Sequence, residues 1–262
     1  MKDFTTQQYA RLIKALKSRG YRFVTFAEFL KSAPDEKVVV LRHDVDLKPA
    51  NSMRIATIEN HLGAKASYYF RAVPESWDDD IIRAIASLGH EIGYHYESLT
   101  TTGGNVTEAY ADFCKNLEKL RLLAPVATIC MHGSPRSPYD SKDLWKTYDY
   151  HDLGIEGEPY FDVDFNHTFY LTDTGRRWDG YKVSVRDKVG HEQEWEQAGL
   201  AFHTTEQIIK ALNADALPSR IMITTHPQRW SDGFVPWLRE LCMQKAKNVV
   251  KRMIVNKQAN KK

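Results

Sequence analysis

The chain has 262 residues, of which 42% are hydrophobic and 27% are charged, and its net charge is +2. This composition is that of a globular protein with enough apolar residues to bury a sizeable core. The near-neutral charge argues against a nucleic-acid-binding protein, and no apolar run approaches the roughly 20 residues that span a bilayer. Because the N-terminus also lacks an apolar signal core, we expect a soluble, cytoplasmic protein without a transmembrane segment.

The cysteines and the basic C-terminal segment exclude further classes. Cys114, Cys130 and Cys242 are widely separated, which argues against a disulfide framework and against a cysteine-based zinc site. The segment 245–262 contains seven Lys or Arg and no Asp or Glu. We interpret it as a solvated basic helix with a frayed tail, in preference to a membrane or nucleic-acid contact. No oligomeric state is predicted.

Hydrophobic periodicity predicts alternating helices and strands in the first half of the chain. The predicted helices cover about 5–20, 49–62, 78–88 and 106–123, and the predicted strands cover 38–41, 66–70, 91–95 and 126–131. Such alternation is typical of parallel β/α units.

The pattern changes from about 150 to 185, where helical periodicity fades and aromatic, Gly and Asp residues dominate. We expect inserted strands and long loops there, over the mouth of a barrel. A helix over 205–212, a strand over 220–225 and a basic helix and tail over about 235–262 restore the α/β pattern. Since no linker divides the chain, we predict one α/β domain over 1–262, folded as a single distorted (β/α) barrel.

Polar residues collect where the predicted strands end. One strand runs into Asp44 and Asp46, and the others lead to His95 and Glu97, His132 and Ser134, and His226. Parallel β/α barrels place their active sites at the carboxyl ends of the strands, so four strands that deliver Asp or His to this face predict a site. A lone Asp here would more simply cap a helix or form a turn, and each lone His has an equally simple structural explanation.

Together these residues are typical of a divalent-metal site with Asp and His ligands, for which zinc is the first choice among first-row ions. One Asp and two His would leave positions for water and a substrate carbonyl. The second Asp could accept a proton from water, and a His on another strand could protonate the leaving group. This set predicts metal-assisted hydrolysis of an amide or ester.

The chain resembles the polysaccharide deacetylase superfamily, the NodB-like enzymes of carbohydrate esterase family 4. The resemblance extends from about 38 to 230 and rests on Asp44-x-Asp46 and on the run from Gly89 to His95, Gly-His-Glu-Ile-Gly-Tyr-His. It implies that Asp44 is the catalytic base, that Asp46 and His95 are metal ligands, and that His226 is the general acid.

The chain departs from the family pattern four residues after His95, where Leu99 replaces a metal-binding His. His132 and Glu97 are the candidate replacements, and we prefer His132 because it lies at the end of a predicted strand. The family's Arg-x-Pro-Tyr motif has a match in 136–139, a few residues beyond that strand, but we assign no role to it.

Several further residues are predicted to contact the substrate. The segment around Asp173 and Trp178 resembles the family segment that lines the site, although a turn centred on Gly175 explains it equally well. Trp230 flanks His226 and, like Trp178, could stack on a sugar ring. We therefore assign Glu97, Ser134, Asp173, Trp178 and Trp230 to substrate binding.

The whole pattern is most similar to a divergent branch of the superfamily associated with O-antigen and other surface polysaccharides. It implies a metal-dependent deacetylase whose substrate is an N-acyl sugar, with nucleotide- or lipid-linked forms included. Two alternatives remain: an inactive protein that binds saccharide or a partner, and a metal hydrolase of another small amide or of a phosphoester. Arg42, Lys48, Arg136, Arg176 and Arg177 would favour a phosphoester if they converged on the site.

Overall fold

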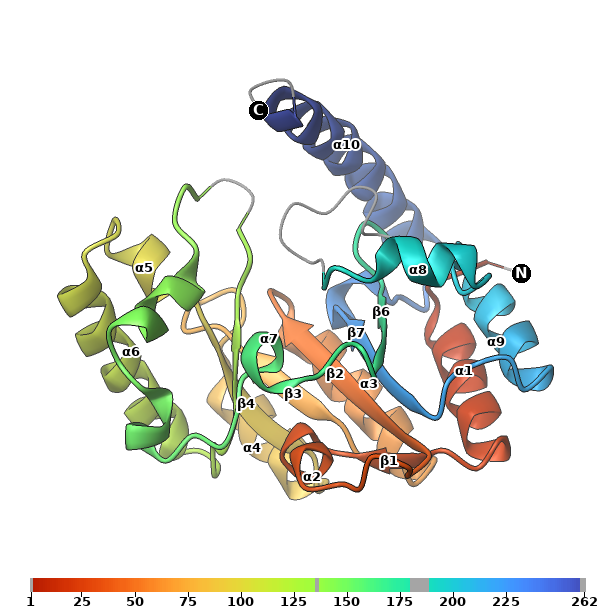
Figure 1. Ribbon diagram of the computed structural model, residues 1–262, viewed down its shortest axis with the longest axis horizontal. Helices are drawn as coiled ribbons and strands as arrows, with labels where there is room; N and C mark the ends of the chain where they lie inside the picture. Colours follow the sequence, from red (N-terminus) through yellow and green to blue (C-terminus); the bar gives the residue numbers. More distant parts are fainter. Residues whose placement is uncertain (1, 135–136, 180–188, 260–262) are drawn as a thin grey trace.

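The fold is built on one parallel sheet of seven strands (Figure 1). The computed structural model describes residues 2–134, 137–179 and 189–259, with side chains up to residue 249. The strand order is β5-β4-β3-β2-β7-β6, and β1 pairs with the first half of β2. The strands are β1 (Arg22–Val24), β2 (Val38–Val45), β3 (Ser67–Phe70), β4 (Glu91–Tyr96), β5 (Ile129–Met131), β6 (Phe169–Thr172) and β7 (Arg220–Thr225).

The sheet curls into a half-barrel, and β5 and β6 form its two edges. The predicted α/β class with a distorted barrel is confirmed in this open form. The segment after β5 covers the free edge of that strand: Ile129 N donates to the Gly157 carbonyl, and Met131 N donates to the carboxylate of Glu158. These bonds protect an edge that would otherwise expose unpaired backbone groups.

The helices follow the predicted order. The longer ones are α1 (Thr6–Ser18), α3 (Pro49–His61), α4 (Asp79–Ser87), α6 (Val106–Arg121), α9 (Thr205–Asn213) and α10 (Phe234–Ala259). The short ones are α2 (Phe26–Leu30), α5 (Ser98–Thr101), α7 (Pro159–Asp162), α8 (Glu192–Gln197) and the 3-10 helices over Ser141–Lys146, Tyr150–Leu153 and Pro227–Arg229. No described helix has the length and apolar character needed to cross a membrane.

Several short elements, among them strand β1 and helix α2, carried no sequence prediction, because runs of three to six residues are too short for a periodic signal. The region from 150 to 185 contains one described strand, β6, which extends the main sheet beside β7. Residues 180–185 of the predicted insertion lie outside the described residues.

Strand β2 is buried on both faces, as central strands of parallel sheets are. Its alternating side chains divide the core. Val39 and Leu41 belong to a large cluster that includes α1, α3, α4, α6 and α9, whereas Val38 and Val40 pack with α2 on the other face. The β-branched residues suit a strand that is enclosed in this way. The same alternation directs the charged residues that follow, so Arg42 and Asp44 lie on one face and His43 on the other.

Glu59 of α3 holds β2 from the helical side. Its carboxylate accepts hydrogen bonds from the hydroxyls of Tyr9 and Tyr68 and contacts Nε2 of His43 at 2.7 Å, and all four side chains are fully buried. Burial disfavours the charged form of Glu59, but His43, His90 and the Tyr68 hydroxyl outweigh burial and lower the pKa of this carboxyl. The network fixes the strand that carries Asp44 and Asp46.

Candidate metal and catalytic site

The polar groups at the carboxyl ends of six strands meet at one edge of the half-barrel. Each strand delivers residues that lie within one position of its last residue: Asp44 and Asp46 from β2, Arg71 from β3, His95 and Glu97 from β4, His132 from β5, Asp173 from β6, and His226 from β7. This is the face where parallel β/α barrels carry their active sites. The residues assigned from separate strand ends are thus brought together.

Asp44 is held by Arg42, two residues earlier on the same face of β2. Arg42 Nε donates to Oδ1 at 2.8 Å and Nη2 donates to Oδ2 at 2.7 Å, and both side chains are buried. Burial opposes ionisation of Asp44, but the guanidinium outweighs burial and holds the pKa of this carboxyl well below its usual range. Asp44 is therefore a fixed anion at neutral pH, and it retains two of its about four lone-pair directions for other partners.

Asp46, His95 and His132 form a compact group of candidate metal ligands. Oδ1 of Asp46 lies 3.7 Å from Nε2 of His95 and 3.6 Å from Nε2 of His132. Tetrahedral zinc with bonds of about 2.0 Å separates its ligand atoms by about 3.3 Å, so these distances are close to those of a metal site. Asp44, His95 and Cys130 also cluster, but Arg42 already engages both oxygens of Asp44.

Hydrogen bonds to the two imidazoles determine which ring nitrogen faces this group. Nδ1 of His95 lies 2.9 Å from the Cys130 carbonyl, which can only accept, so this nitrogen carries the proton. Nδ1 of His132 lies 2.9 Å from a carboxylate oxygen of Glu97, which fixes the same tautomer. Burial lowers the pKa of His95 to about 4, so this ring is neutral at pH 7. In the neutral ring of His95, Nε2 bears a lone pair, and Nε2 of both rings points toward Asp46.

The arrangement fits a divalent cation. Three lone-pair atoms converge, and Oδ1 of Asp46 is buried without a hydrogen-bond partner. Neutral imidazoles whose Nδ1–H is bonded to a carbonyl or carboxylate are the usual form of metal-binding histidines. A divalent metal ion is a partner that would satisfy these three atoms together.

A second group surrounds His226 and approaches Asp46 from the β7 side. Nδ1 of His226 lies 2.7 Å from Oδ1 of Asp173, and its Nε2 lies 3.8 Å from Oδ2 of Asp46. Asp173 also accepts hydrogen bonds from Arg229 and from the indole of Trp230. Burial raises the cost of charge on Asp173, but Arg229 and His226 outweigh it and lower the pKa of this carboxyl. Asp173 thus orients His226 with Nε2 directed into the site.

Glu97 connects His132 to Arg71. Arg71 donates from Nε and Nη2 to Oε1 of Glu97, and from Nη1 to the backbone carbonyl of Asp46. Burial favours the neutral form of Glu97, but His132 and Arg71 lower the pKa of this carboxyl to about 2. Glu97 was predicted as a substrate contact or as an alternative ligand, and its described bonds are those of a residue that positions His132.

Ser134 lies two residues beyond His132, partly buried. Arg136 of the Arg-x-Pro-Tyr match lies outside the described residues, and Tyr139 of that match is 40% exposed. Leu99, at the position of the missing ligand, lies on α5 with its side chain in the hydrophobic core. His132 is the described His that takes the third place near Asp46 and His95.

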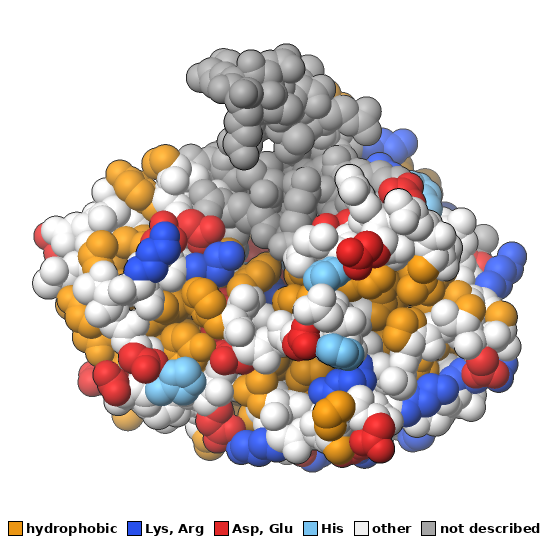
Figure 2. Space-filling model, viewed as in Figure 1, with side chains coloured by type: hydrophobic (Ala, Val, Ile, Leu, Met, Phe, Trp, Pro, Cys, Tyr) orange, Lys and Arg blue, Asp and Glu red, His pale blue; other side chains and the backbone are white. Residues whose placement is uncertain are grey.

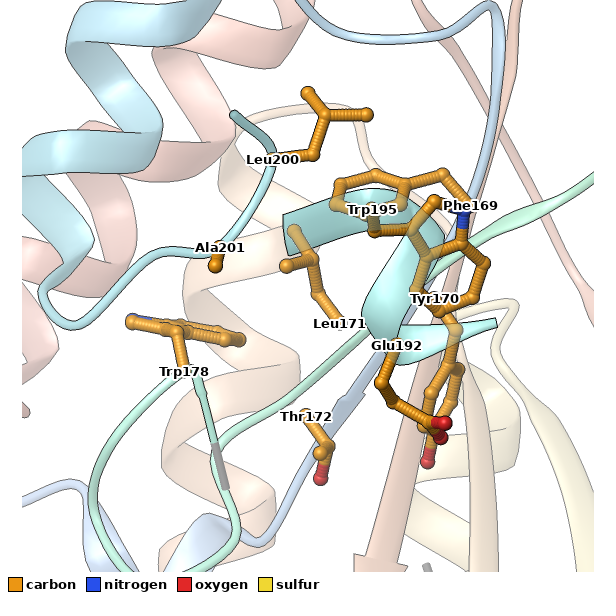
Figure 3. Close-up of a pocket in the computed structure, with 9 residues that line it drawn as sticks. All are labelled: Phe169, Tyr170, Leu171, Thr172, Trp178, Glu192, Trp195, Leu200 and Ala201. Atoms are coloured by element: carbon orange, nitrogen blue, oxygen red, sulfur yellow. The ribbon is translucent and has the colours of Figure 1, made fainter. Parts of the chain in front are cut away.

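Trp178 and Trp230 are both buried, with 3% and 1% of their surface exposed. The two indoles pack against Phe4, and Nε1 of Trp178 donates to the hydroxyl of Thr205. Trp178 also lines an apolar pocket beside β6 with Phe169, Leu171 and Trp195 (Figure 3). Sugar stacking on these rings stays a prediction, while their observed contacts serve the core and, for Trp230, the orientation of Asp173.

Three residues of the site carried no prediction from the sequence: Arg71, Gln228 and Arg229. Gln228 donates to Oδ2 of Asp46 at 3.2 Å. The segment Pro227–Arg229 turns back as one 3-10 turn, and this turn directs Gln228 and Arg229 to the carboxylates. The only sequence signal was their position next to His226.

Among the comparisons with known proteins, only the comparison with solved structures finds similar proteins. No protein-family model and no curated protein matches the chain. Similar solved structures include the family 4 carbohydrate esterase PdaA of Bacillus subtilis, with 11% identity over 89% of this chain and 82% of that one, at a TM-score of 0.42. A CE4 esterase of Streptococcus mutans is 13% identical over 92% and 91% of the two chains, at a TM-score of 0.47.

A CE4 family pseudoenzyme from Bacillus anthracis is also similar, with 13% identity over 82% of this chain and a TM-score of 0.45. The chain spans 63% of the length of that protein and 64% of a mutant of it. Likeness at this level concerns the course of the backbone, and the chemistry of the site rests on the residues described above.

The bond from Glu97 to His132 yields a prediction about metal affinity. The substitution Glu97→Gln removes the charge that fixes the His132 tautomer, so we expect the affinity for Zn²⁺ or Co²⁺ to fall about 10- to 100-fold. Isothermal titration calorimetry measures this change directly. The matched control is Glu108→Gln, on the exposed first turn of α6, which should bind as wild type does. Equal affinity in wild type and Glu97→Gln would exclude His132 as a ligand positioned by Glu97.

Proposed function

We propose that this protein is a metal-dependent hydrolase that removes an acyl group, first of all an acetyl group, from an N-acylated sugar of bacterial surface-polysaccharide metabolism. The observation that carries the proposal is the convergence of Asp46, His95 and His132 on one point, with Asp44 on one side and His226 on the other. The sugar amide is supported by the sequence resemblance, above all by the run from Gly89 to His95.

Asp46, His95 and His132 would hold the divalent ion, with zinc the first choice for one carboxylate and two imidazoles. When bound, such an ion polarises the scissile carbonyl and lowers the pKa of water. Asp44, kept ionised and fixed by Arg42, accepts the proton that the attacking water gives up. The water oxygen forms a bond to the acyl carbon as this proton leaves.

His226 completes the reaction at the leaving group. Its Nδ1 is held by Asp173, so Nε2 is the nitrogen that can deliver a proton to the amine as the carbon–nitrogen bond breaks. The carboxylate of Asp173 holds the His226 ring in this orientation, and Trp230 and Arg229 keep Asp173 in place. The products are a carboxylate and a free amino sugar.

The cations near the site favour an amide over a phosphoester. Arg42 bonds Asp44, Arg176 donates to the Trp237 carbonyl, Arg177 bonds Asp179, and Lys48 lies 3.8 Å from Glu240. Each of these four cations is thus directed at another group of the protein, and they do not converge on the site as phosphate binding would require.

The proposed function is tested by acetate release from N-acetylglucosamine oligosaccharides with added Zn²⁺ or Co²⁺. We expect activity in wild type and a loss of about 10²- to 10⁴-fold in kcat for Asp44→Asn and for His226→Gln, with metal content unchanged. The matched controls Asp152→Asn and His61→Gln lie at exposed positions and should keep wild-type rates. If the folded protein binds metal but releases acetate from none of these sugars, the proposal is contradicted and the inactive saccharide-binding alternative is favoured. If it hydrolyses only phosphoesters, the alternative of a metal-dependent phosphoesterase is favoured.

The ion pair of Arg42 and Asp44 predicts a specific pH dependence. Arg42 lowers the pKa of Asp44, so in wild type the carboxylate form of Asp44 persists far into acid. In Arg42→Gln the cation is gone and burial is opposed only by His95 and His226, so the pKa of Asp44 rises and the base is protonated at higher pH. We expect the acid limb of kcat/KM to move to higher pH, with a smaller shift in Arg42→Lys, which keeps the charge.

Circular dichroism of both Arg42 variants controls for folding, because the loss of one partner from a buried ion pair costs about 3–5 kcal/mol. An acid limb that stays at the wild-type pH in a folded, active Arg42→Gln would show that Asp44 is not the base.

A further inference from the structure

The C-terminal helix α10 packs against the protein with its polar side. Glu240 and Gln244 are 4% and 6% exposed and bond to each other, and Asn248 donates to the carbonyl of Gly175. These positions follow at intervals of four residues and therefore lie on one face of the helix. An ordinary surface helix buries its apolar face, so α10 is reversed in this respect.

The opposite side of α10 exposes apolar side chains. Val235, Leu238 and Val249 are 74%, 40% and 55% exposed, and Cys242 is exposed as well. At 3.6 residues per turn these four positions fall within an arc of about 60°, roughly opposite Gln244. We call these four residues the apolar stripe. Of the eight large exposed hydrophobic residues in the described chain, five lie on α10: Phe234, Val235, Leu238, Met243 and Val249.

Positive charge flanks the apolar stripe. Arg239 and Lys245 are exposed and fall on its two sides by the same helical geometry. Nζ of Lys2 lies 4.1 Å from the centre of the Phe234 ring. From residue 241 to 262 the sequence contains no Asp or Glu, whereas 245–262 contains seven Lys or Arg. By contrast, on the face shown in Figure 2 basic and acidic side chains are interspersed.

This charge distribution selects among the occupants that could cover the stripe. A second copy of α10 would bring together two segments of the same sign, which disfavours pairing. An anionic lipid surface is complementary to both features, since interfacial helices bury an apolar face among the acyl chains and place Lys and Arg at the head groups. Figure 1 shows α10 projecting from the body of the protein, so a flat surface can reach it.

The exposed apolar stripe changes the interpretation drawn from the sequence, in which this basic segment was a solvated helix. We infer that α10 binds, in the plane of the membrane, to a bilayer surface that contains anionic lipids. Only residues 230–233 separate the helix from the turn Pro227–Arg229 after His226, so binding would hold the edge of the half-barrel that carries the candidate site close to that surface. The inference rests on the exposure and charge of α10 and is independent of the proposed hydrolase activity.

The test is flotation of the full chain with vesicles of phosphatidylcholine alone and of phosphatidylcholine with about 30% phosphatidylglycerol. We expect wild type to float with the anionic vesicles at least tenfold more than with the neutral ones, and to be released by high salt. The double variant Leu238→Gln/Val249→Gln should lose at least tenfold in binding, and Lys245→Glu/Lys247→Glu should lose the preference for anionic vesicles. The matched control Leu122→Gln changes an 82% exposed apolar residue at the end of α6 and should float as wild type does.

Two results would overturn the inference. One is equal flotation of wild type with anionic and neutral vesicles, or with neither. The other is a wild-type dimer in light scattering that becomes a monomer in Leu238→Gln/Val249→Gln, because a second copy would then occupy the stripe. All these variants alter exposed side chains, so folding is expected to be preserved and is checked by circular dichroism.

Discussion

Strand β2 carries three ionisable side chains in succession, Arg42, His43 and Asp44, through the buried middle of the sheet, and each of them must find a partner inside the protein. The alternation of the strand sends His43 to one face, where Glu59 meets it, and Arg42 to the other, where it binds Asp44. Each of the three side chains thus has a polar partner, since an unpaired ion at these positions would cost several kcal/mol. The packing of the helices on one face of β2 depends on the contact of His43 with Glu59, and the candidate site on the other face depends on the pair of Arg42 and Asp44.

Hydrogen bonding to buried partners also explains why the three histidines of the site share one orientation. Bonds to the Cys130 carbonyl, to Glu97 and to Asp173 occupy Nδ1 of His95, His132 and His226, so all three rings direct Nε2 inward. Around Asp46, two of these nitrogens face a carboxylate oxygen that has no hydrogen-bond partner. A cation would complete such a cluster, and in the proposed mechanism His226, held by Asp173, delivers the proton beside it.

Much of this arrangement could be predicted because the signals are local. The spacing of Asp44 and Asp46 places them at one strand end, and the end of each predicted strand located His95, His132 and His226 before any three-dimensional information. Contacts made by long side chains across strands could not be predicted in this way: Arg71 and Glu97 are joined through space, and nothing in their sequence spacing indicates this contact.

Elements of three to five residues, such as β1 and α2, were missed because tertiary packing stabilises them and periodicity cannot appear in so short a run. The reversed polarity of α10 was also absent from the sequence interpretation, because only the packed structure shows which side of that helix faces the body.

The central claim is that Asp46, His95 and His132 together hold one divalent ion. The most direct measurement is the metal content, by mass spectrometry, of untagged protein purified without chelators, for wild type and for His132→Ala, with His151→Ala as an exposed control. The account predicts close to one metal ion per chain in wild type and in the control, and a large loss in His132→Ala, since Leu99 leaves no other His in the third position. A wild type that stays free of metal after reconstitution with Zn²⁺ at neutral pH, or a His132→Ala variant with full metal content, would contradict it.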